Sequence, residues 1–135
     1  MAEPVPFGVR IIDHLVLRSG DAPRLVAFYR DVIGLPVERQ TRSGLTQLRA
    51  GASLVDIVPV EDRDRPGRNL EHFCLRVDPF DEAAIRRHLE AAGAEIVKSG
   101  TAYGADGRGP NLYFRDPDGN EVELKGLGDG KRETE

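Results

Sequence analysis

The sequence has little cysteine, no tryptophan and no long apolar run. Its single cysteine, Cys74, cannot form an intrachain disulfide, which excludes a disulfide-stabilised scaffold and dithiol redox chemistry. A transmembrane helix needs about 20 mostly apolar residues in succession, and the sequence has no such stretch. Its first residues also lack the basic and apolar regions of a secretory signal peptide. We therefore expect a cytoplasmic protein with no membrane partner.

An excess of positive charge is missing as well. The 135 residues include 19 Lys and Arg against 23 Asp and Glu, a formal net charge of −4. A nucleic-acid-binding protein needs a basic stripe for the phosphates, and here Lys and Arg are scattered, so we expect no nucleic-acid partner. Apolar residues, at 39%, suffice for the core of one compact domain, while 15 Gly and 9 Pro favour many short elements over a few long helices.

The sequence does contain a repeated order of structural signals. Period-two alternation predicts strands, and apolar residues at helical spacing predict one helix after the first strand of each repeat. Each repeat is thus a strand, a helix and three strands, a βαβββ module. Module 1 covers 9–60, a charged linker covers 61–69 and module 2 covers 70–126, while the polar ends 1–8 and 127–135 should be flexible. The predicted strands are 11–17, 37–39, 45–50, 53–60, 70–77, 94–98, 111–115 and 121–125, and the predicted helices are 22–33 and the segment between Asp81 and Gly93.

Each module has a histidine on its first predicted strand and a carboxylate on its last. The pairs are His14 with Asp56 and His72 with Glu123. Alternation places the apolar neighbours of both carboxylates on the opposite face, so each sheet presents an imidazole and a carboxylate together. A lone strand histidine is usually a hydrogen-bonded structural residue, but the repetition of the pair favours a metal site. Two imidazoles and two carboxylates suit Zn, Ni, Co, Mn or Fe(II), although the shorter Asp56 could ligate through water.

Longer motifs surround these residues. They are DHLVL at 13–17, FYRDVIGL at 28–35 and YFRDPDGNEVEL at 113–124. With the duplicated βαβββ order, they resemble the vicinal oxygen chelate superfamily, which includes glyoxalase I, fosfomycin-resistance thiol transferases, bleomycin-binding proteins, extradiol dioxygenases and methylmalonyl-CoA epimerase. The resemblance extends over about residues 9–126. The fold class that we predict is α+β, with two βαβββ modules forming curved mixed sheets around a metal-binding cleft.

The resemblance also implies residue roles and an assembly. It places His14, Asp56, His72 and Glu123 at the metal-ligand positions. It further implies a homodimer in which module 1 of one subunit pairs with module 2 of the other, so that each metal site is shared by two chains.

Two departures from glyoxalase I bear on the substrate. That enzyme usually has Gly before the second histidine and Glu at the position of Asp56, whereas this chain has Glu71 and Asp56. A glutathione hemithioacetal is therefore a less favoured substrate. Both metal histidines are present, which disfavours a metal-free binding protein.

Four further residues are candidates for substrate binding: Tyr103, Arg108, Tyr113 and Arg115. The first two lie in a glycine-rich stretch, 101–110, which resembles loops that close over substrate and whose Tyr and Arg suit an anion. An ordinary hairpin connection is the alternative. Asp116-Pro117-Asp118-Gly119 is turn chemistry and receives no catalytic role.

These features predict a divalent-metal-dependent lyase, isomerase or thiol transferase acting on a small oxygenated metabolite or antibiotic, with a thiol as the possible co-substrate. The metal would be the Lewis acid, and Glu123 or Asp56 the general base. Two alternatives stay open. His14, His72 and Glu123 alone would make the ligand triad of an Fe(II) extradiol-type dioxygenase. A bleomycin-resistance type of protein would instead bind a drug or metabolite in the same cleft without catalysis.

Overall fold

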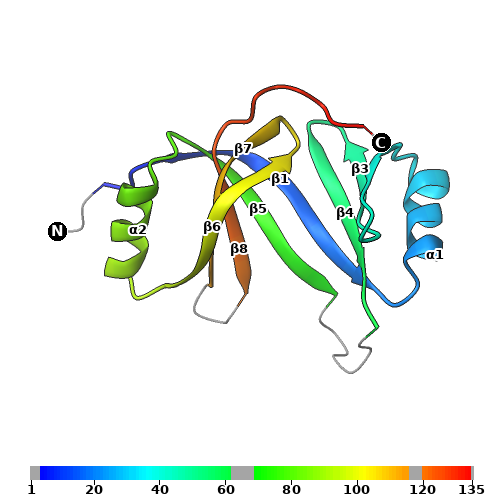
Figure 1. Ribbon diagram of the computed structural model, residues 1–135, viewed down its shortest axis with the longest axis horizontal. Coiled ribbons are helices and arrows are strands. Elements are labelled where there is room, and N and C mark those ends of the chain that lie inside the picture. Colours follow the sequence, from blue (N-terminus) through cyan, green and yellow to red (C-terminus); the bar gives the residue numbers. More distant parts are fainter. Residues whose placement is uncertain (1–3, 62–68, 116–119, 135) are drawn as a thin grey trace.

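The computed structural model describes residues 4–61, 69–115 and 120–134. Its two βαβββ modules form one curled, eight-stranded mixed sheet, which confirms the predicted α+β class (Figure 1). Module 1 consists of β1 (Gly8–Ser19), α1 (Ala22–Ala27), η1 (Phe28–Ile33), β2 (Val37–Gln40), β3 (Thr46–Ala50) and β4 (Ser53–Pro59). Module 2 consists of β5 (Leu70–Asp78), α2 (Glu82–Ala91), β6 (Glu95–Gly104), β7 (Gly107–Arg115) and β8 (Glu121–Lys125).

Both predicted helices are present, and an aspartate caps the start of each. The Asp21 carboxylate accepts a hydrogen bond from the Arg24 amide at the start of α1, and Asp81 accepts one from the Ala84 amide at the start of α2. The helix predicted at 22–33 divides into α1 and the π-helical η1, and it ends where Gly34 takes a left-handed conformation with φ 89°. A residue without Cβ adopts this conformation at no steric cost.

The first and last strands of both modules lie next to one another in the centre of the sheet. The strand order is β2-β3-β4-β1-β5-β8-β7-β6. Strand β1 runs parallel to β4 and antiparallel to β5, and β5 runs parallel to β8. The four strands that carry the candidate ligands are therefore neighbours, and the register decides how close those ligands come.

Helices cover the outer face of the sheet at its two ends (Figure 1). Beneath α1 lies a core of Ala22, Val26, Leu48 and Ile57, and beneath α2 lies a core of Val77, Ile85, Leu89, Leu112 and Leu124. Because side chains alternate along a strand, burying Ile57 and Leu124 on this face turns Asp56 and Glu123 toward the opposite, concave face. Within the described ranges, no helix is long and apolar enough to cross a bilayer.

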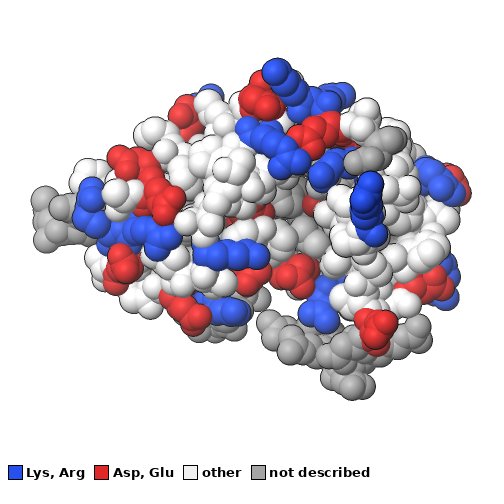
Figure 2. Space-filling view, in the orientation of Figure 1, with Lys and Arg blue, Asp and Glu red and all other residues white. Residues whose placement is uncertain are grey.

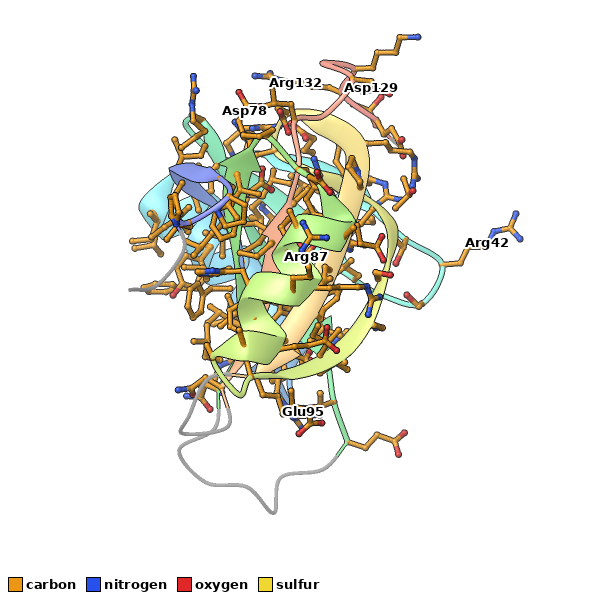
Figure 3. The ribbon with its side chains drawn as sticks, turned by 90° about the vertical axis from the view of Figure 1, so that its left-hand side faces the viewer. Arg42, Asp78, Arg87, Glu95, Asp129 and Arg132 are labelled. Carbon is orange, nitrogen blue, oxygen red and sulfur yellow. The ribbon has the colours of Figure 1, made fainter. Side chains whose placement is uncertain are left out.

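Charged side chains on the outer surface point into solvent. Figure 3 shows Arg87 on the exposed side of α2, with Arg42 and Glu95 extending away from the sheet.

Residues 101–104 and 107–110 are strand, so this stretch is the hairpin connection that stood as the alternative to a loop closing over substrate. Strands β6 and β7 pair continuously from Thr101 opposite Pro110 to Gly104 opposite Gly107, so the chain turns only at Ala105 and Asp106. Tyr103 and Ala105 pack on Leu54 of β4. The β6–β7 hairpin therefore reaches module 1 and closes one side of the curled sheet.

The chain ends make contacts where they are described, and the flexibility expected of 1–8 and 127–135 stays a prediction. The Gly128 and Gly130 amides donate hydrogen bonds to Asp106, and the Asp129 amide donates one to the Arg108 carbonyl. The C-terminal segment thus runs along the β6–β7 hairpin toward module 1 (Figure 1). At the other end, Phe7 packs on the core beneath α2. Hydrogen bonds and apolar burial hold these ends. The composition of the C-terminal segment, which is polar and rich in glycine, did not indicate these contacts.

Candidate metal centre

Side chains from β1, β5 and β8 converge on the concave face of the sheet. The ligand atoms of His14, His72 and Glu123 all lie within 4.8 Å of one another. Glu123 Oε1 is 3.1 Å from His14 Nε2 and 3.2 Å from His72 Nε2. The strand register produces this convergence, because Cys74 pairs with both His14 and Glu123, and Val16 pairs with His72. The structure therefore brings together three of the four predicted ligands.

Two of the converging atoms have no hydrogen-bond partner. His72 Nε2 and Glu123 Oε1 are buried, and among the described residues neither makes a hydrogen bond, although they lie 3.2 Å apart. Their orientation does not align an N–H with an oxygen lone pair. Leaving such atoms unpaired costs free energy, and proteins seldom do so without a ligand or water. A divalent cation would satisfy both atoms, so the residues fit the metal that the sequence predicts.

Hydrogen bonds to the remaining polar atoms orient the cluster. His14 Nδ1 lies 2.7 Å from Asp13 Oδ2, and Asn111 Nδ2 donates to Glu123 Oε2 at 3.0 Å. These bonds leave His14 Nε2 and Glu123 Oε1 facing the common point. Metal-binding histidines and carboxylates in proteins are commonly fixed in this way by a second hydrogen bond.

The ionisation of the cluster also suits a cation. Burial by itself would raise the pKa of the Glu123 carboxyl, but the adjoining His14 and His72 imidazoles and the Asn111 amide outweigh it and hold this pKa well below its usual range. Burial by itself would lower the pKa of His14, but Asp13, Cys74 and Glu123 raise it well above the usual value. Glu123 is thus a carboxylate at neutral pH, and a metal must compete with protons for His14.

Asp56 lies in the same cavity without joining the cluster. Its Oδ2 accepts a hydrogen bond from Gln47 Nε2 at 3.0 Å, and its Oδ1 has no partner among the described residues. Within the described part of the chain, the groups of ligand atoms lying within 4.8 Å of one another do not include Asp56. Burial raises the pKa of its carboxyl. The structure therefore places Asp56 beside the three convergent ligands, with one free oxygen.

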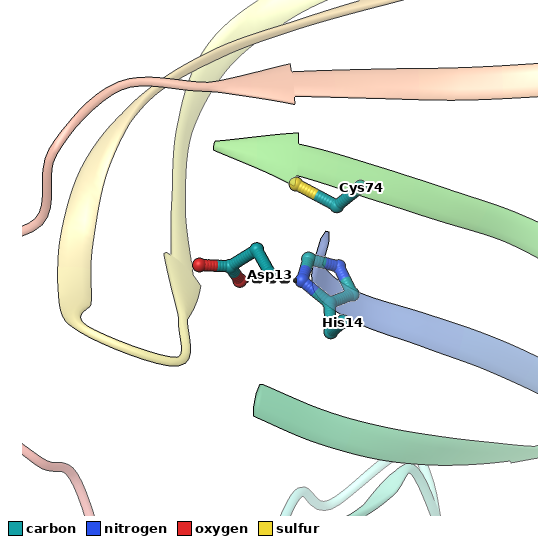
Figure 4. A group of neighbouring side chains, drawn as sticks. All are labelled: Asp13, His14 and Cys74. Carbon is teal, nitrogen blue, oxygen red and sulfur yellow. Dashed lines mark hydrogen bonds and ion pairs between the residues drawn. The ribbon is translucent and has the colours of Figure 1, made fainter. Parts of the chain in front are cut away.

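Two other groups of ligand-type atoms are less suited to a metal. In the first, shown in Figure 4, Asp13 is already bound to His14, and burial raises the pKa of the Cys74 thiol to about 12. A neutral thiol is a poor metal ligand, and Cys74 is fully buried beside His14. In the second, around His72, Glu71 and Glu121 are partly exposed, and each lies within ion-pairing distance of an arginine.

A cavity of about 610 Å³ contains the candidate metal centre. Figure 2 shows this hollowed face, with Lys and Arg side chains gathered around the hollow. Three arginines, Arg18, Arg39 and Arg108, are among its lining residues. The remaining lining residues are His14, Val16, Ser43, Leu45, Gln47, Asp56, Val58, Val60, Glu71, His72, Ala102, Tyr103, Tyr113 and Glu123.

Three of the four predicted substrate-binding residues line this cavity. They are Tyr103, Arg108 and Tyr113, and the Tyr113 ring meets the His72 ring edge-on with centroids 5.2 Å apart. Arg115 is not among its lining residues, so the structure does not bring it together with the other three. It lies at the end of β7, where its cross-strand neighbours Glu95 and Glu121 approach its guanidinium to 3.4 and 4.0 Å.

The C-terminal segment contacts two residues that line the cavity. Arg108 Nη2 donates to Glu133 Oε1 at 2.8 Å, and the Glu133 amide donates to Tyr103 Oη at 3.0 Å. Glu133 therefore holds two of the predicted substrate-binding side chains in place. The sequence did not indicate this role, because the segment carries no strand or helix signal.

Sequence reasoning also missed several polar residues of the site. Alternation from His14 and Tyr113 would have indicated Arg18 and Asn111, which lie an even number of residues away on the same strands. Asp13 gave no such signal, since alternation places it on the face opposite His14.

All three convergent ligands come from one chain, and the expectation of a metal site shared between two subunits stays a prediction. Strands β1 and β5 of the same chain pair directly, so modules 1 and 2 meet without exchange. The homodimer itself stays a prediction.

Relatives of this chain were found in the superfamily that the motifs resemble. The family model described as Glyoxalase/Bleomycin resistance protein/Dioxygenase superfamily matches residues 11–124. Glutathione transferase FosA of Serratia marcescens is 28% identical over 121 residues, covering 84% of this chain and 78% of that protein. Metallothiol transferase FosB of Shouchella clausii is 24% identical over 114 residues, covering 84% of this chain and 77% of that protein.

Solved structures share the fold at lower identity. The Mn(II)-bound glyoxalase from Novosphingobium aromaticivorans matches with a TM-score of 0.73 at 20% identity, over 96% of this chain and 43% of that one. The family match spans both modules and includes His14, His72 and Glu123. The chain therefore belongs to the Glyoxalase/Bleomycin resistance protein/Dioxygenase superfamily.

Proposed function

We propose that this protein is a divalent-metal-dependent thiol transferase acting on a small, oxygen-rich anion. The observation that carries the proposal is the convergence of His14, His72 and Glu123, with buried unpaired atoms, inside a cavity large enough for a small molecule. Two relatives, a glutathione transferase and a metallothiol transferase, support the choice of thiol transfer among the reactions of the superfamily.

The cavity wall supports an anionic substrate. Arg18, Arg39 and Arg108 line it in a chain whose net charge is −4. A guanidinium offers several N–H donors in a fixed plane and binds carboxylate, phosphonate or phosphate groups in a bidentate manner. Arg108 already binds the Glu133 carboxylate in this way, through Nε and Nη2. Arg18 lies 3.7 Å from the Glu71 carboxylate and Arg39 lies 3.7 Å from the Glu133 carboxylate, so a substrate anion would compete with these acids for the two guanidinium groups.

Asp56 is the residue that we assign as proton acceptor for the thiol. Its Oδ1 is buried and unpaired, Gln47 holds its Oδ2, and burial raises its pKa, all of which suit a general base better than the low pKa of Glu123. In the proposed step the thiol proton passes to Asp56 Oδ1, and the thiol sulfur forms a bond to a substrate carbon. The carbon–oxygen bond at that carbon breaks, and its electron pair stays on the substrate oxygen. A bound divalent ion would supply Lewis-acid polarisation of the substrate oxygens.

A second candidate function rests on the exclusion of Asp56 from the cluster. Two histidines and one carboxylate make up the ligand set of non-haem Fe(II) enzymes that activate oxygen. An extradiol-type dioxygenase would consume oxygen with a catechol and would require iron, whereas thiol transfer would proceed without oxygen. The third possibility is a protein that binds a small molecule without catalysis, in which His14, His72 and Glu123 would hold no metal.

Metal analysis combined with turnover assays tests these functions. Purified protein is loaded with Mn(II), Zn(II), Ni(II), Co(II) or Fe(II) and incubated with fosfomycin plus glutathione or cysteine, with methylglyoxal plus glutathione, or with catechols under air and under argon. We expect metal-dependent thiol consumption that is insensitive to oxygen, and a cytoplasmic location would supply the reduced thiol. Oxygen consumption with a catechol would favour the dioxygenase, and ligand binding without metal would favour the binding protein.

His72→Ala and His88→Ala form a matched pair for the same assays. His72 is one of the convergent ligands, whereas His88 lies on α2 and does not line the cavity. Metal content and thiol consumption should fall with His72→Ala and persist with His88→Ala. Equal losses from both substitutions would contradict the proposed metal site.

A further inference from the structure

Asp13 is fully buried next to His14, although consecutive strand residues normally face opposite sides of a sheet. The register between β1 and β5 shifts between Ile12 and His14, which marks an irregularity of the bulge type. Such a bulge redirects a side chain. Here it allows both Asp13 and His14 to face the interior.

Every group that contacts the Asp13 carboxylate is positioned to donate a hydrogen bond. Its Oδ1 accepts from Arg76 Nε at 3.0 Å and from Arg76 Nη2 at 2.6 Å. Its Oδ2 accepts from the Ala105 amide at 3.0 Å and lies 2.7 Å from His14 Nδ1. The Arg76 and Ala105 groups can only donate. A carboxylate with two acceptor oxygens matches them, and the proton between Oδ2 and His14 must then reside on Nδ1.

The tautomer of His14 follows from this arrangement. When Nδ1 carries the proton of a neutral imidazole, Nε2 has a lone pair. Nε2 is the atom that lies 3.1 Å from Glu123 Oε1 in the cluster. The opposite tautomer would place a hydrogen on Nε2 and remove its lone pair from the site.

The backbone around Asp13 is shaped for this contact. A Cβ atom at Gly104 would lie 2.4 Å from Asp13 Oδ2 and 2.8 Å from Lys125 Cε. Only glycine allows the β6–β7 hairpin to approach closely enough for the Ala105 amide to reach the carboxylate. Glycine is needed at position 104 because Asp13 and Lys125 lie so close to its Cα, and not because of its backbone conformation.

Arg76 is held in turn by a second acid. Asp106 Oδ1 lies 3.2 Å from Arg76 Nε and 3.1 Å from the buried Lys125 Nζ, and Asp106 Oδ2 accepts from the Gly128 amide at 2.8 Å. The guanidinium that faces Asp13 is therefore fixed from both sides. Asp106 touches the same arginine without touching the imidazole, which makes it a natural control.

We propose that Asp13 is a positioning residue that holds His14 in the tautomer and orientation needed for metal binding through Nε2. The inference rests on the proposed metal site and assigns a role that none of the convergent ligands performs. Asparagine cannot replace Asp13, because in either orientation of the amide its NH2 group would face a donor, either Arg76 or the Ala105 amide. If it faced Ala105 and His14, it would also favour the wrong tautomer.

The test compares Asp13→Asn with Asp106→Asn in the full chain. Co(II) affinity is measured by competition with a chelating dye, and the ¹⁵N shifts and Nδ1–H signal of His14 are recorded in Zn(II)-loaded protein. We expect Asp13→Asn to weaken Co(II) binding by about 10- to 100-fold and to remove the hydrogen-bonded Nδ1–H signal. Asp106→Asn should lower thermal stability yet leave Co(II) affinity within about threefold and retain that signal.

Gly104→Ala is the second variant, in case Asp13→Asn does not fold. The added Cβ should displace the Asp13 carboxylate without changing any charge. We expect Gly104→Ala, like Asp13→Asn, to bind Co(II) more weakly than wild type. Equal losses of Co(II) affinity in Asp106→Asn and Asp13→Asn, or unchanged affinity in Asp13→Asn, would overturn the positioning role. If Asp13→Asn does not fold, unchanged affinity in Gly104→Ala would overturn it.

His72→Ala separates this inference from the proposed function. If wild-type protein binds Co(II), His72→Ala does not, and Asp13→Asn binds like wild type, the metal site stands and the role of Asp13 is refuted. If wild type binds no better than His72→Ala, the proposed metal site itself fails, and the inference fails with it.

Discussion

Replacing His72 by phenylalanine should separate metal binding from stability. In the metal-free protein both ring nitrogens of His72 are buried, with no hydrogen-bond partner among the described residues. A buried polar atom without a partner costs about 1–3 kcal/mol of stability. Phenylalanine keeps a ring against Tyr113 and removes both nitrogens. We expect the metal-free variant to be about as stable as the metal-free wild type, because the gain from removing the unpaired nitrogens is offset by imperfect packing of the larger ring and by loss of the imidazole that stabilises the Glu123 carboxylate.

Added metal should stabilise the wild type and have little effect on His72→Phe. A ligand at 100 times its Kd stabilises the native state by about 2.7 kcal/mol, which for a domain of this size raises Tm by roughly 10 °C. Wild type should show this rise, and His72→Phe should show almost none, because it has lost one of the three convergent ligands.

Differential scanning calorimetry measures both effects, with EDTA and with Mn(II) or Zn(II). His88→Phe is the control, since His88 lies on α2 and does not line the cavity. The reasoning would be refuted if His72→Phe kept the metal-dependent rise, or if its metal-free Tm fell by more than about 5 °C.

Three further predictions concern the same site. Bound metal, measured after dialysis at stepped pH, should fall as pH decreases, because the raised pKa of His14 makes protons compete for its imidazole while Glu123 stays ionised; constant occupancy in acid would contradict imidazole ligation. Asp56→Asn should lower the rate of thiol transfer by about 10²-fold or more while metal affinity stays near wild type, and loss of the metal itself would show that Asp56 is a ligand. Mixing refolded His14→Ala and His72→Ala chains should restore no metal binding, because each site is formed within one chain; restored binding would indicate exchange of modules between subunits.

Local signals in the sequence determined most of the elements of this protein. Asp21 and Asp81 indicated where the helices begin, and Gly34 indicated where the first helical segment ends. These features depend on hydrogen bonds and backbone angles within a few residues, so a short window of sequence contains them. Alternation likewise placed His14, His72 and Glu123 on one face of their strands.

Only the tertiary structure decided which of these residues meet. Direct pairing of β1 with β5 within one chain brought His14 to Glu123, and the register left Asp56 beside the cluster. A shift in that register turned Asp13 inward, against the alternation of its strand, and hydrogen bonds from Asp106 fixed a C-terminal segment whose composition indicated flexibility. Contacts between residues far apart in sequence depend on how whole strands align, and no local pattern carries that information.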